Sequence, residues 1–201
     1  NCQNDKRKYQ IKAGGIIFYH HVYDHDKYIK TLILMIDKEG VMEDIGGKRN
    51  HRNPKINQMA DRDVYDMVSR EVEEESNGYF QREQIYKMIE NQTMIYNQMG
   101  KYALFFVELK NIVDCSLFGD YEIKSNIPRR MEWVDSRFFS NLDLHPRLKY
   151  RPIGKFIRYT WPHKIKTTNT DGRHTIQLTI GSTDQSSNML VVDNTSTNLS
   201  I

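Results

Sequence analysis

Three glutamates, Glu71, Glu74 and Glu75, lie close enough in the sequence to share one cation. They belong to the segment 63–75, in which apolar residues recur every three or four positions, as is typical of an amphipathic helix. Asp63 stands where such a helix commonly begins, because its side chain can accept a hydrogen bond from the first turn. The sequence therefore predicts one helix that carries all three carboxylates.

The helical periodicity places these carboxylates beside the apolar face. At about 100° per residue, Glu75 falls between Val64 and Val68. Glu71 and Glu74 follow next to it. Carboxylates this close to one another and to apolar surface repel each other unless something neutralises them. Mg²⁺ prefers oxygen ligands and commonly binds through one or two carboxylates plus substrate phosphates, so the pattern favours a divalent cation. The alternative is an acidic surface helix at the edge of a core.

The remaining polar residues of this helix are expected on its opposite side. Tyr65 and Val72 extend the apolar stripe, whereas Asp66, Arg70 and Glu73 fall on the far side. We therefore expect Asp66, Arg70 and Glu73 to face solvent.

A glycine pair precedes the helix. Gly46 and Gly47 are followed by Lys48. Two glycines let the backbone pass close to phosphate oxygens, and the lysine can add a charge-assisted contact. Alone, Gly-Gly-Lys is a weak signal. In front of the acidic helix, it indicates a phosphate-binding segment formed by these three residues.

Taken together, these residues resemble the motif of the Nudix hydrolase family. That motif is Gly, five residues, Glu, seven residues, Arg-Glu, an aliphatic residue, any residue, Glu-Glu, any residue, Gly and an aliphatic residue. Gly47 supplies the first glycine, and the core of the motif is matched at the right spacing by Arg70, Glu71, Val72, Glu74 and Glu75. The resemblance implies that the three glutamates bind Mg²⁺ or Mn²⁺ and that Arg70 orients them. It also implies an α/β/α sandwich around a mixed sheet.

The chain departs from the motif in the loop before the helix. Twenty-two residues separate Gly47 from Arg70 where the motif has thirteen, so the loop 49–62 is longer and rich in Arg and Asn. Arg62 stands at the position of the first glutamate, and Asp61 or Asp63 could substitute for it.

A second departure follows the helix. Asn77 replaces the later glycine of the motif, and Gly78 comes one place afterwards. Asn tolerates the left-handed backbone that a helix C-terminus often needs, so this change is mild.

The resemblance implies hydrolysis of a diphosphate linkage. We assign Glu71, Glu74 and Glu75 to the metal, with Glu75 as the central ligand, and Lys48 to a substrate phosphate. Metal-bound carboxylates are poor bases, so a further residue is expected to deprotonate the attacking water. Glu122 and Glu132 are the candidates, and Glu132 has a structural alternative as a partner of the adjacent arginine pair.

Several functions stay open at this stage. The first hypothesis is a pyrophosphohydrolase acting on a nucleoside diphosphate derivative. Alternatives are mRNA 5′-cap removal, in which the loop 49–62 could track RNA, and diphosphoinositol phosphate hydrolysis. A catalytically silent binding module of the same fold is the alternative of another class. Aromatic residues that could stack on a base, or simply belong to the core, are Phe18, Tyr19, Phe106 and Trp133.

Composition sets the outer bounds. The 201 residues are 38% hydrophobic and 27% charged, which suits one well-cored domain, and the net charge of +3 permits polyanionic substrates. Basic residues gather modestly in 48–62 and 129–166. With no signal peptide or membrane-length apolar run in the sequence, we expect a soluble, cytoplasmic or otherwise intracellular protein. Cys2 and Cys115 are expected to be free thiols because their spacing fits neither a metal site nor a disulfide framework.

The expected organisation has three parts. Residues 1–8 are expected to be disordered, 9–161 to form the domain that resembles the Nudix family, and 162–201 to form a polar tail in which 176–180 and 189–192 could add edge strands. Strands and helices alternate as in α/β or α+β proteins. Expected strands are 9–20, 28–36, 41–45, 93–96, 102–109 and 131–134, and expected helices are 63–75, 80–91 and 152–161.

Overall fold

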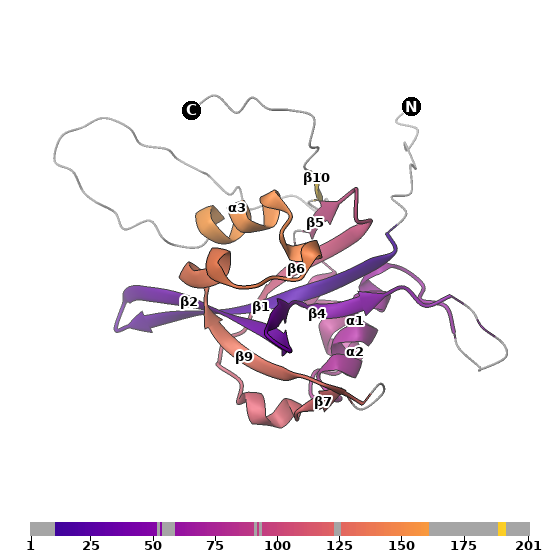
Figure 1. The fold of residues 1–201 in the computed structure, drawn as a ribbon, viewed down its shortest axis with the longest axis horizontal. Coiled ribbons are helices and arrows are strands. Elements are labelled where there is room, and N and C mark those ends of the chain that lie inside the picture. Colours follow the sequence, from indigo (N-terminus) through magenta and orange to yellow (C-terminus); the bar gives the residue numbers. More distant parts are fainter. Residues whose placement is uncertain are drawn as a thin grey trace.

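A mixed eight-stranded sheet forms the centre of the molecule (Figure 1). The structure is a computed structural model that describes residues 11–51, 53, 59–90, 92, 94–122, 126–160 and 189–191. The sheet runs in the order β10-β5-β6-β1-β2-β3, with β4 paired to β1 and β9 paired to β2. Its strands are β1 (Ala13–Asp24), β2 (Lys27–Lys38), β3 (Val41–Glu43), β4 (Ile45–Lys48), β5 (Met94–Asn97), β6 (Tyr102–Glu108), β9 (Arg130–Asp135) and β10 (Met189–Val191).

Strand β1 organises the sheet because it pairs with three others. It is antiparallel to β2 and β4, and parallel to β6, with Gly14 opposite both Gly47 and Ala103. A long hairpin therefore joins β1 to β2. The parallel partner β6 follows α1 (Val64–Glu75) and α2 (Arg82–Ile89) in the sequence. Away from this sheet, β7 (Tyr121–Glu122) and β8 (Ile127–Pro128) form a two-stranded ribbon.

Helical elements cover both faces of the sheet (Figure 1). Helices α1 and α2 pack on one face through a core that includes Val68 and Ile85. On the other face, Leu148 and Ile153 belong to a second core under α3 (Arg151–Thr160) and the short 3₁₀ segments η3 (Ser136–Asn141) and η4 (Pro146–Leu148). A further 3₁₀ turn, η2, spans Cys115–Phe118. The expected α/β fold, a sandwich of helices around a mixed sheet, is confirmed.

Most of the expected elements lie within a few residues of their observed bounds. The hairpin of β5 and β6 forms as predicted, and Asp63 caps α1 by accepting a hydrogen bond from the backbone of Asp66 at 2.8 Å. The segment 189–192 does add an edge strand, since β10 pairs in parallel with β5. The other predicted edge segment, 176–180, lies outside the described residues.

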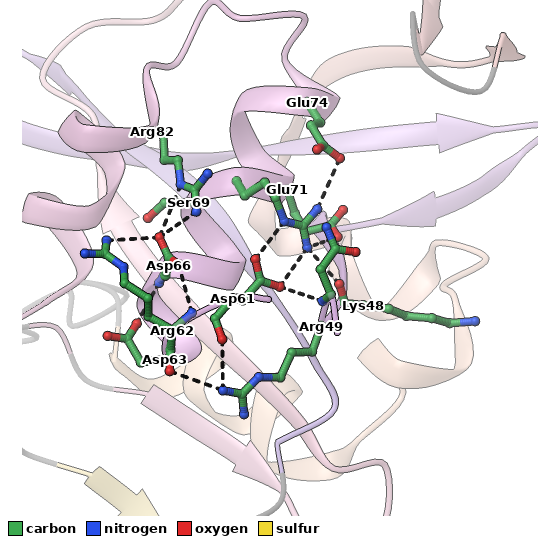
Figure 2. A network of polar contacts seen from close by, with 12 residues as sticks. Lys48, Arg49, Asp61, Arg62, Asp63, Asp66, Ser69, Glu71, Glu74 and Arg82 are labelled. Atoms are coloured by element: carbon green, nitrogen blue, oxygen red, sulfur yellow. Dashed lines mark hydrogen bonds and ion pairs between the residues drawn. The ribbon is translucent and has the colours of Figure 1, made fainter. Parts of the chain in front are cut away.

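The predicted solvent-facing side of α1 was wrong at two positions. Asp66 is 2% exposed and Arg70 is 8% exposed. The periodicity considers only the helix itself, whereas α2 and the segment before α1 bring charged partners over this side. Arg62 and Arg82 converge on Asp66, as Figure 2 shows. Burial opposes ionisation of this carboxyl, yet the hydrogen bonds from both arginines outweigh it and hold its pKa well below the usual range.

The structure tests only part of what the sequence predicts about the cysteines, membrane-spanning helices and domain limits. Cys115 is a free thiol, and Cys2 lies outside the described residues. In the parts of the chain that the structure describes, no helix has the length and apolarity to cross a bilayer. The domain limits at 8 and 162 fall on residues that are not described.

Candidate active site

The glycine pair sits where three stretches of backbone meet. A Cβ atom on Gly46 would collide with the carbonyl oxygen of Gly14 and with the Cα of Gly15 on the adjacent strand. A Cβ on Gly47 would instead overlap the carboxylate of Glu71. Gly46 thus allows β4 to approach β1, while Gly47 leaves room for the first of the three helix carboxylates. The structure brings Gly47 and Glu71 together as the motif suggests.

Arg70 lies at the centre of a charge cluster that includes Asp61, Glu71 and Glu74. Its Nε and Nη2 atoms donate to the two carboxylate oxygens of Asp61 at 2.9 and 3.0 Å. Nη1 donates to Glu74 at 3.2 Å, and Nη2 lies 2.8 Å from a carboxylate oxygen of Glu71. Nη2 also donates to the carbonyl oxygen of Lys48 at 2.9 Å. Arg70 therefore fixes helix α1 to the end of β4 and holds two of the three glutamates.

The electrostatics of Arg70 follow from these contacts. Burial disfavours its charged form, but the hydrogen bonds that it donates to Asp61 and the charges of Glu71 and Glu74 more than offset this and raise the pKa of the guanidinium. Arg70 is thus a permanent cation within the acidic cluster. This position agrees with the orienting role that the family resemblance implies.

The two aspartates near the missing motif glutamate have separate tasks. Asp61 is 4% exposed and, besides binding Arg70, accepts a hydrogen bond from the backbone of Asn50 at 2.6 Å. Asp63 caps the helix and accepts a hydrogen bond from Tyr86 at 3.2 Å. Arg49 donates to the backbone carbonyl oxygen of Asp61 at 3.2 Å, as Figure 2 shows. The lengthened loop therefore returns to the site through Asp61, which anchors the arginine.

Glu75 lies in a second and different charge cluster. It is 6% exposed, as its predicted place beside the apolar stripe requires. Lys38 of β2 donates to its Oε1 at 3.4 Å, and the Nε of Arg129 lies 3.3 Å from its Oε2. An Nη2 hydrogen bond from Arg129 reaches the carbonyl oxygen of Glu75. Sequence reasoning missed both basic partners, because Lys38 of β2 and Arg129, between β8 and β9, are far from α1 in the chain.

This second cluster is incompletely hydrogen-bonded. Among the described residues, Oε2 of Glu75 and both Nε and Nη1 of Arg129 are buried without a hydrogen-bond partner. Burial raises the pKa of Glu75, and the charge of Glu122 adds to the rise, although Lys38 and Arg129 oppose it. Buried polar atoms nearly always have a partner, so such a gap indicates a place for a further group.

The two candidate bases lie in different surroundings. Glu122, on β7, is near enough for its charge to affect the pKa of both Glu75 and Arg129. Glu132, on β9, lies 3.4 Å from the Nη2 atom of Arg130, which is the structural alternative that the sequence suggested. The charge of Glu122 acts on both Glu75 and Arg129, which favours Glu122 over Glu132 as the candidate base.

Asn77 connects the end of α1 to the segment that carries Glu122. Its φ angle of 52° is left-handed, as expected for a residue that replaces a glycine after a helix. Its side-chain amide donates to the carbonyl oxygens of Phe118 at 2.6 Å and Tyr121 at 3.0 Å. A glycine could not make these two bonds. The departure from the motif thus positions the residues just before Glu122.

Lys48 extends away from the Arg70 cluster (Figure 2). It lines an open pocket of about 560 Å³ together with Ile11, Lys12, Arg49 and His51. Three of these neighbours are basic or titratable to a cation, so the pocket suits a phosphate chain that reaches beyond the glutamates. The predicted phosphate contact of Lys48 itself stays a prediction.

A metal ion requires some rearrangement of these side chains. Within the described part of the chain, no group of three or more His, Cys, Asp or Glu residues is placed to hold a metal. The donor chemistry nevertheless fits a hard divalent cation, since Glu71, Glu74 and Glu75 present carboxylate oxygens on one side of α1. The buried Oε2 atom of Glu75 lies 3.3 Å from the Nε atom of Arg129 but accepts no hydrogen bond from a described residue, and it is the feature of the structure that a cation would satisfy.

The aromatic candidates divide between core and strand edge. Phe18 is 0% exposed and Phe106 is 5% exposed, so both belong to the core. Trp133 packs against the core and donates its indole N–H to the carbonyl oxygen of Val113 at 2.9 Å. Tyr19 is half-buried, and burial, with the nearby charge of Glu108, raises its pKa to about 12.

No protein-family model and no curated protein matches this sequence. Among solved structures, one match is a crystal structure of a C. elegans Ap4A hydrolase binary complex. It has 17% sequence identity and a TM-score of 0.43, and the match covers 74% of this chain and 93% of that one. These values are too low to assign a family, so the proposal below is based on the residues of this chain alone.

Proposed function

We propose that the chain is a Mg²⁺- or Mn²⁺-dependent hydrolase of the Nudix type that cleaves a diphosphate linkage in a nucleoside diphosphate derivative. The observation that carries this proposal is the arrangement of Glu71, Glu74 and Glu75 on α1. Two of them are held by Arg70 beneath the Gly47 backbone, and the third has a buried oxygen without a hydrogen-bond partner. An acidic surface helix would need neither the clamp nor the buried carboxylate.

The residues of the chain have separate roles in this proposal. Glu71, Glu74 and Glu75 would hold the cation, which would neutralise charge on the phosphate oxygens, position the water and stabilise the leaving group. Arg70 fixes the rotamers of Glu71 and Glu74 through its two Nη atoms. Lys48 would bind a substrate phosphate, with the basic pocket beside it available to the rest of a phosphate chain.

Glu122 is the favoured general base. Its charge acts on Glu75, and it is not one of the three proposed cation ligands, so we assign to it the acceptance of the proton of the attacking water. Glu132 stays the second candidate, although it already forms an ion pair with Arg130. Replacing each by Gln separates them, because only loss of the base should remove the rise of the hydrolysis rate with pH on the acidic side of the optimum.

The substrate class stays open among three polyphosphates. Capped RNA and diphosphoinositol phosphates are the alternatives to nucleoside diphosphate derivatives, since each presents a diphosphate linkage and further negative charge. Capped RNA would contact more basic residues, so its binding should weaken steeply as salt rises. A nucleotide derivative would show a much shallower salt dependence.

A silent binding module is the second candidate function. It is favoured by the arginines that already neutralise the three glutamates, and by Arg62 at the position of the motif glutamate. Such a protein would bind a polyphosphate without turning it over. Metal binding distinguishes the two functions, because a module that has lost turnover in this way has no need of the cation.

The test is phosphate-product release from all three substrate classes with Mg²⁺ or Mn²⁺. The comparison is between the wild type, Glu75→Gln, and the matched control Glu83→Gln on the exposed side of α2. We expect cleavage of one class by the wild type and the control, with a loss of at least about 100-fold in Glu75→Gln. A folded wild type that binds neither Mn²⁺ nor Mg²⁺ by calorimetry would overturn the enzyme and leave the binding module.

A further inference from the structure

A second concave site lies on the face of the sheet opposite α1. It is a pocket of about 470 Å³ between η3 and α3. Five basic side chains line it, and the lining contains no acidic residue; the five are Arg137, Lys149, Arg151, Lys155 and Arg158. The pocket falls within the basic region 129–166 that the sequence analysis identified and that the proposed hydrolase function does not use.

Three of these side chains come from one side of α3. Arg151, Lys155 and Arg158 are spaced by four and three residues, which puts them on the same helix face, and all three are exposed. Helix α3 has no acidic residue, and none of the three makes an ion pair with a described residue. Like charges at this spacing destabilise a helix, so the arrangement favours a bound anion over a merely solvated surface.

Gly154 keeps the pocket open from the helix side. It lines the pocket, and a Cβ atom placed on it would meet no atom within 4 Å. Glycine inside a helix is less stable than alanine, and no close contact of the protein requires it here. Any longer side chain at this position would project into the space between the basic residues.

Ser136 supplies an unused hydrogen-bonding group at the wall. It is 5% exposed, and its Oγ atom has no hydrogen-bond partner among the described residues. A buried hydroxyl without a partner is costly, whereas a phosphate oxygen in the pocket would accept its hydrogen bond. Two of the basic residues are positioned in advance, since Asp135 holds Arg137 at 2.6 Å and Asp143 holds Lys149 at 3.3 Å.

We propose that this pocket is a second anion site, distinct from the glutamate cluster, and that it binds a small molecule carrying several phosphates. Arg151 and Arg158 are seven residues apart, or about 10 Å along the helix, which matches a compact polyphosphate more closely than an extended strand of RNA. The volume also lies in the range of small-molecule sites. Arg151, Lys155 and Arg158 bind the phosphates, and Ser136 donates to one of their oxygens.

The test follows the backbone amide resonances of Ser136 and Gly154 during titration of the full chain. Inorganic tripolyphosphate is the probe, and EDTA is present so that the glutamate cluster does not bind it through a metal. We expect saturable shifts of both resonances. In Arg151→Gln/Lys155→Gln/Arg158→Gln, the affinity should fall by at least about tenfold. The matched control is Lys27→Gln/Lys87→Gln/Lys110→Gln, which removes the same charge from exposed lysines elsewhere and should bind as the wild type does.

A steric variant separates a built site from diffuse attraction. Gly154→Leu keeps every charge, suits a helix better than glycine, and fills the open space, so it should abolish the shift of Ser136. Equal losses in the pocket variant and the lysine control, or unchanged binding in Gly154→Leu, would overturn the proposal.

Further ligands identify the source of the phosphates. ATP and inositol hexakisphosphate are compared as competitors of tripolyphosphate, and stronger competition by either one names the class of ligand. A ten-nucleotide oligouridylate is the third competitor. If it shifts Ser136 and Gly154 and binds more tightly than tripolyphosphate, the surface is a nucleic-acid track and the small-molecule site is refuted.

Discussion

Helix α1 carries two buried charge clusters that differ in how completely they are hydrogen-bonded. At Arg70, all three guanidinium nitrogens have carboxylate or carbonyl partners. At Glu75, one carboxylate oxygen and two nitrogens of Arg129 have no hydrogen-bond partner among the described residues. The central pair of each cluster, Arg70 with Asp61 and Glu75 with Arg129, has less than a tenth of its surface exposed.

This difference separates a clamp from a binding position. A buried ion that is fully paired fixes the elements around it, and removing one partner leaves a charge with nothing to balance it. A buried carboxylate with one oxygen that accepts no hydrogen bond has the same desolvation cost, but fewer hydrogen bonds offset that cost. Binding of a further group to this oxygen would offset the rest. The Arg70 cluster therefore accounts for the shape of the site, and the Glu75 cluster for its chemistry.

The clamp should be the more sensitive of the two to substitution. In Arg70→Met, the carboxylate of Asp61 loses its only described guanidinium partner while staying buried, so we expect a loss of about 3–5 kcal/mol in the free energy of unfolding. Urea denaturation measures it. Arg130→Gln is the matched control. The side chain of Arg130 is 66% exposed although it forms ion pairs, so its replacement should lower the free energy of unfolding by less than about 1 kcal/mol. Similar losses in the two variants would remove the distinction between clamp and surface pair.

Removing the basic partner of Glu75 should cost less. In Arg129→Met, Lys38 still contacts the carboxylate, and Glu75 can take up a proton because burial already raises its pKa. We expect a loss of about 1–3 kcal/mol by urea denaturation. Adding Glu75→Gln should recover part of it, since no buried charge is then left. A double variant less stable than Arg129→Met would show that the cluster is as fully compensated as the clamp.

The glycine that contacts Glu71 offers a smaller and more local change. The Cβ atom in Gly47→Ala displaces a flexible carboxylate and touches no backbone, so the unfolding free energy should fall by about 1 kcal/mol or less. Displacement of a proposed cation ligand should nevertheless reduce metal-dependent hydrolysis by about 100-fold. The measurement is the ratio of activity to stability, compared with Gly100→Ala in the exposed turn between β5 and β6. Full activity in Gly47→Ala would exclude Glu71 from the metal site.

The smallest effect concerns pH and lies on the other face of the sheet. Burial, and then the charge of Arg147, lower the pKa of His145, whose neutral Nδ1 accepts a hydrogen bond from the Arg147 backbone at 3.3 Å. Because the folded pKa is below the unfolded value, the stabilisation is present above about pH 6.5 and is lost as the pH falls through the folded pKa. Thermal unfolding of the wild type and His145→Gln should therefore converge on acidification. A gap that is constant from pH 8 to 5 would contradict this assignment.

Local features of the fold and site could be read from the sequence. The bounds of α1, the cap at Asp63 and the burial of Glu75 follow from helical periodicity and capping chemistry within a single segment. The hairpin of β5 and β6 likewise depends on residues close together in the chain. These elements are determined by neighbours a few positions away, which is the range over which periodicity is informative.

The partners of the buried charges could not be read in this way. Lys38 and Arg129 are 37 and 54 residues from Glu75, and nothing in the local pattern of either residue indicates the contact. The predicted exposure of Asp66 and Arg70 was wrong for the same reason. Residues outside α1 cover the side of the helix that the periodicity assigned to solvent. An unexplained arginine next to a strand, such as Arg129, is the one signal that could have indicated a distant carboxylate.

The pairing of β9 with β2 has a consequence for the order in which the molecule folds. Trp133 on β9 lies opposite Leu34 on β2, so this pairing joins segments about a hundred residues apart in the chain. Arg129, which contacts Glu75, stands directly before β9. Contacts between distant segments form slowly, whereas helices form quickly. We therefore expect refolding to pass through an interval in which α1 is present but Glu75 still faces water. In stopped-flow refolding of Trp161→Phe, which leaves Trp133 as the one tryptophan of the sequence, far-ultraviolet circular dichroism should recover before the fluorescence of Trp133, and simultaneous recovery would show that the strands close as early as the helix forms.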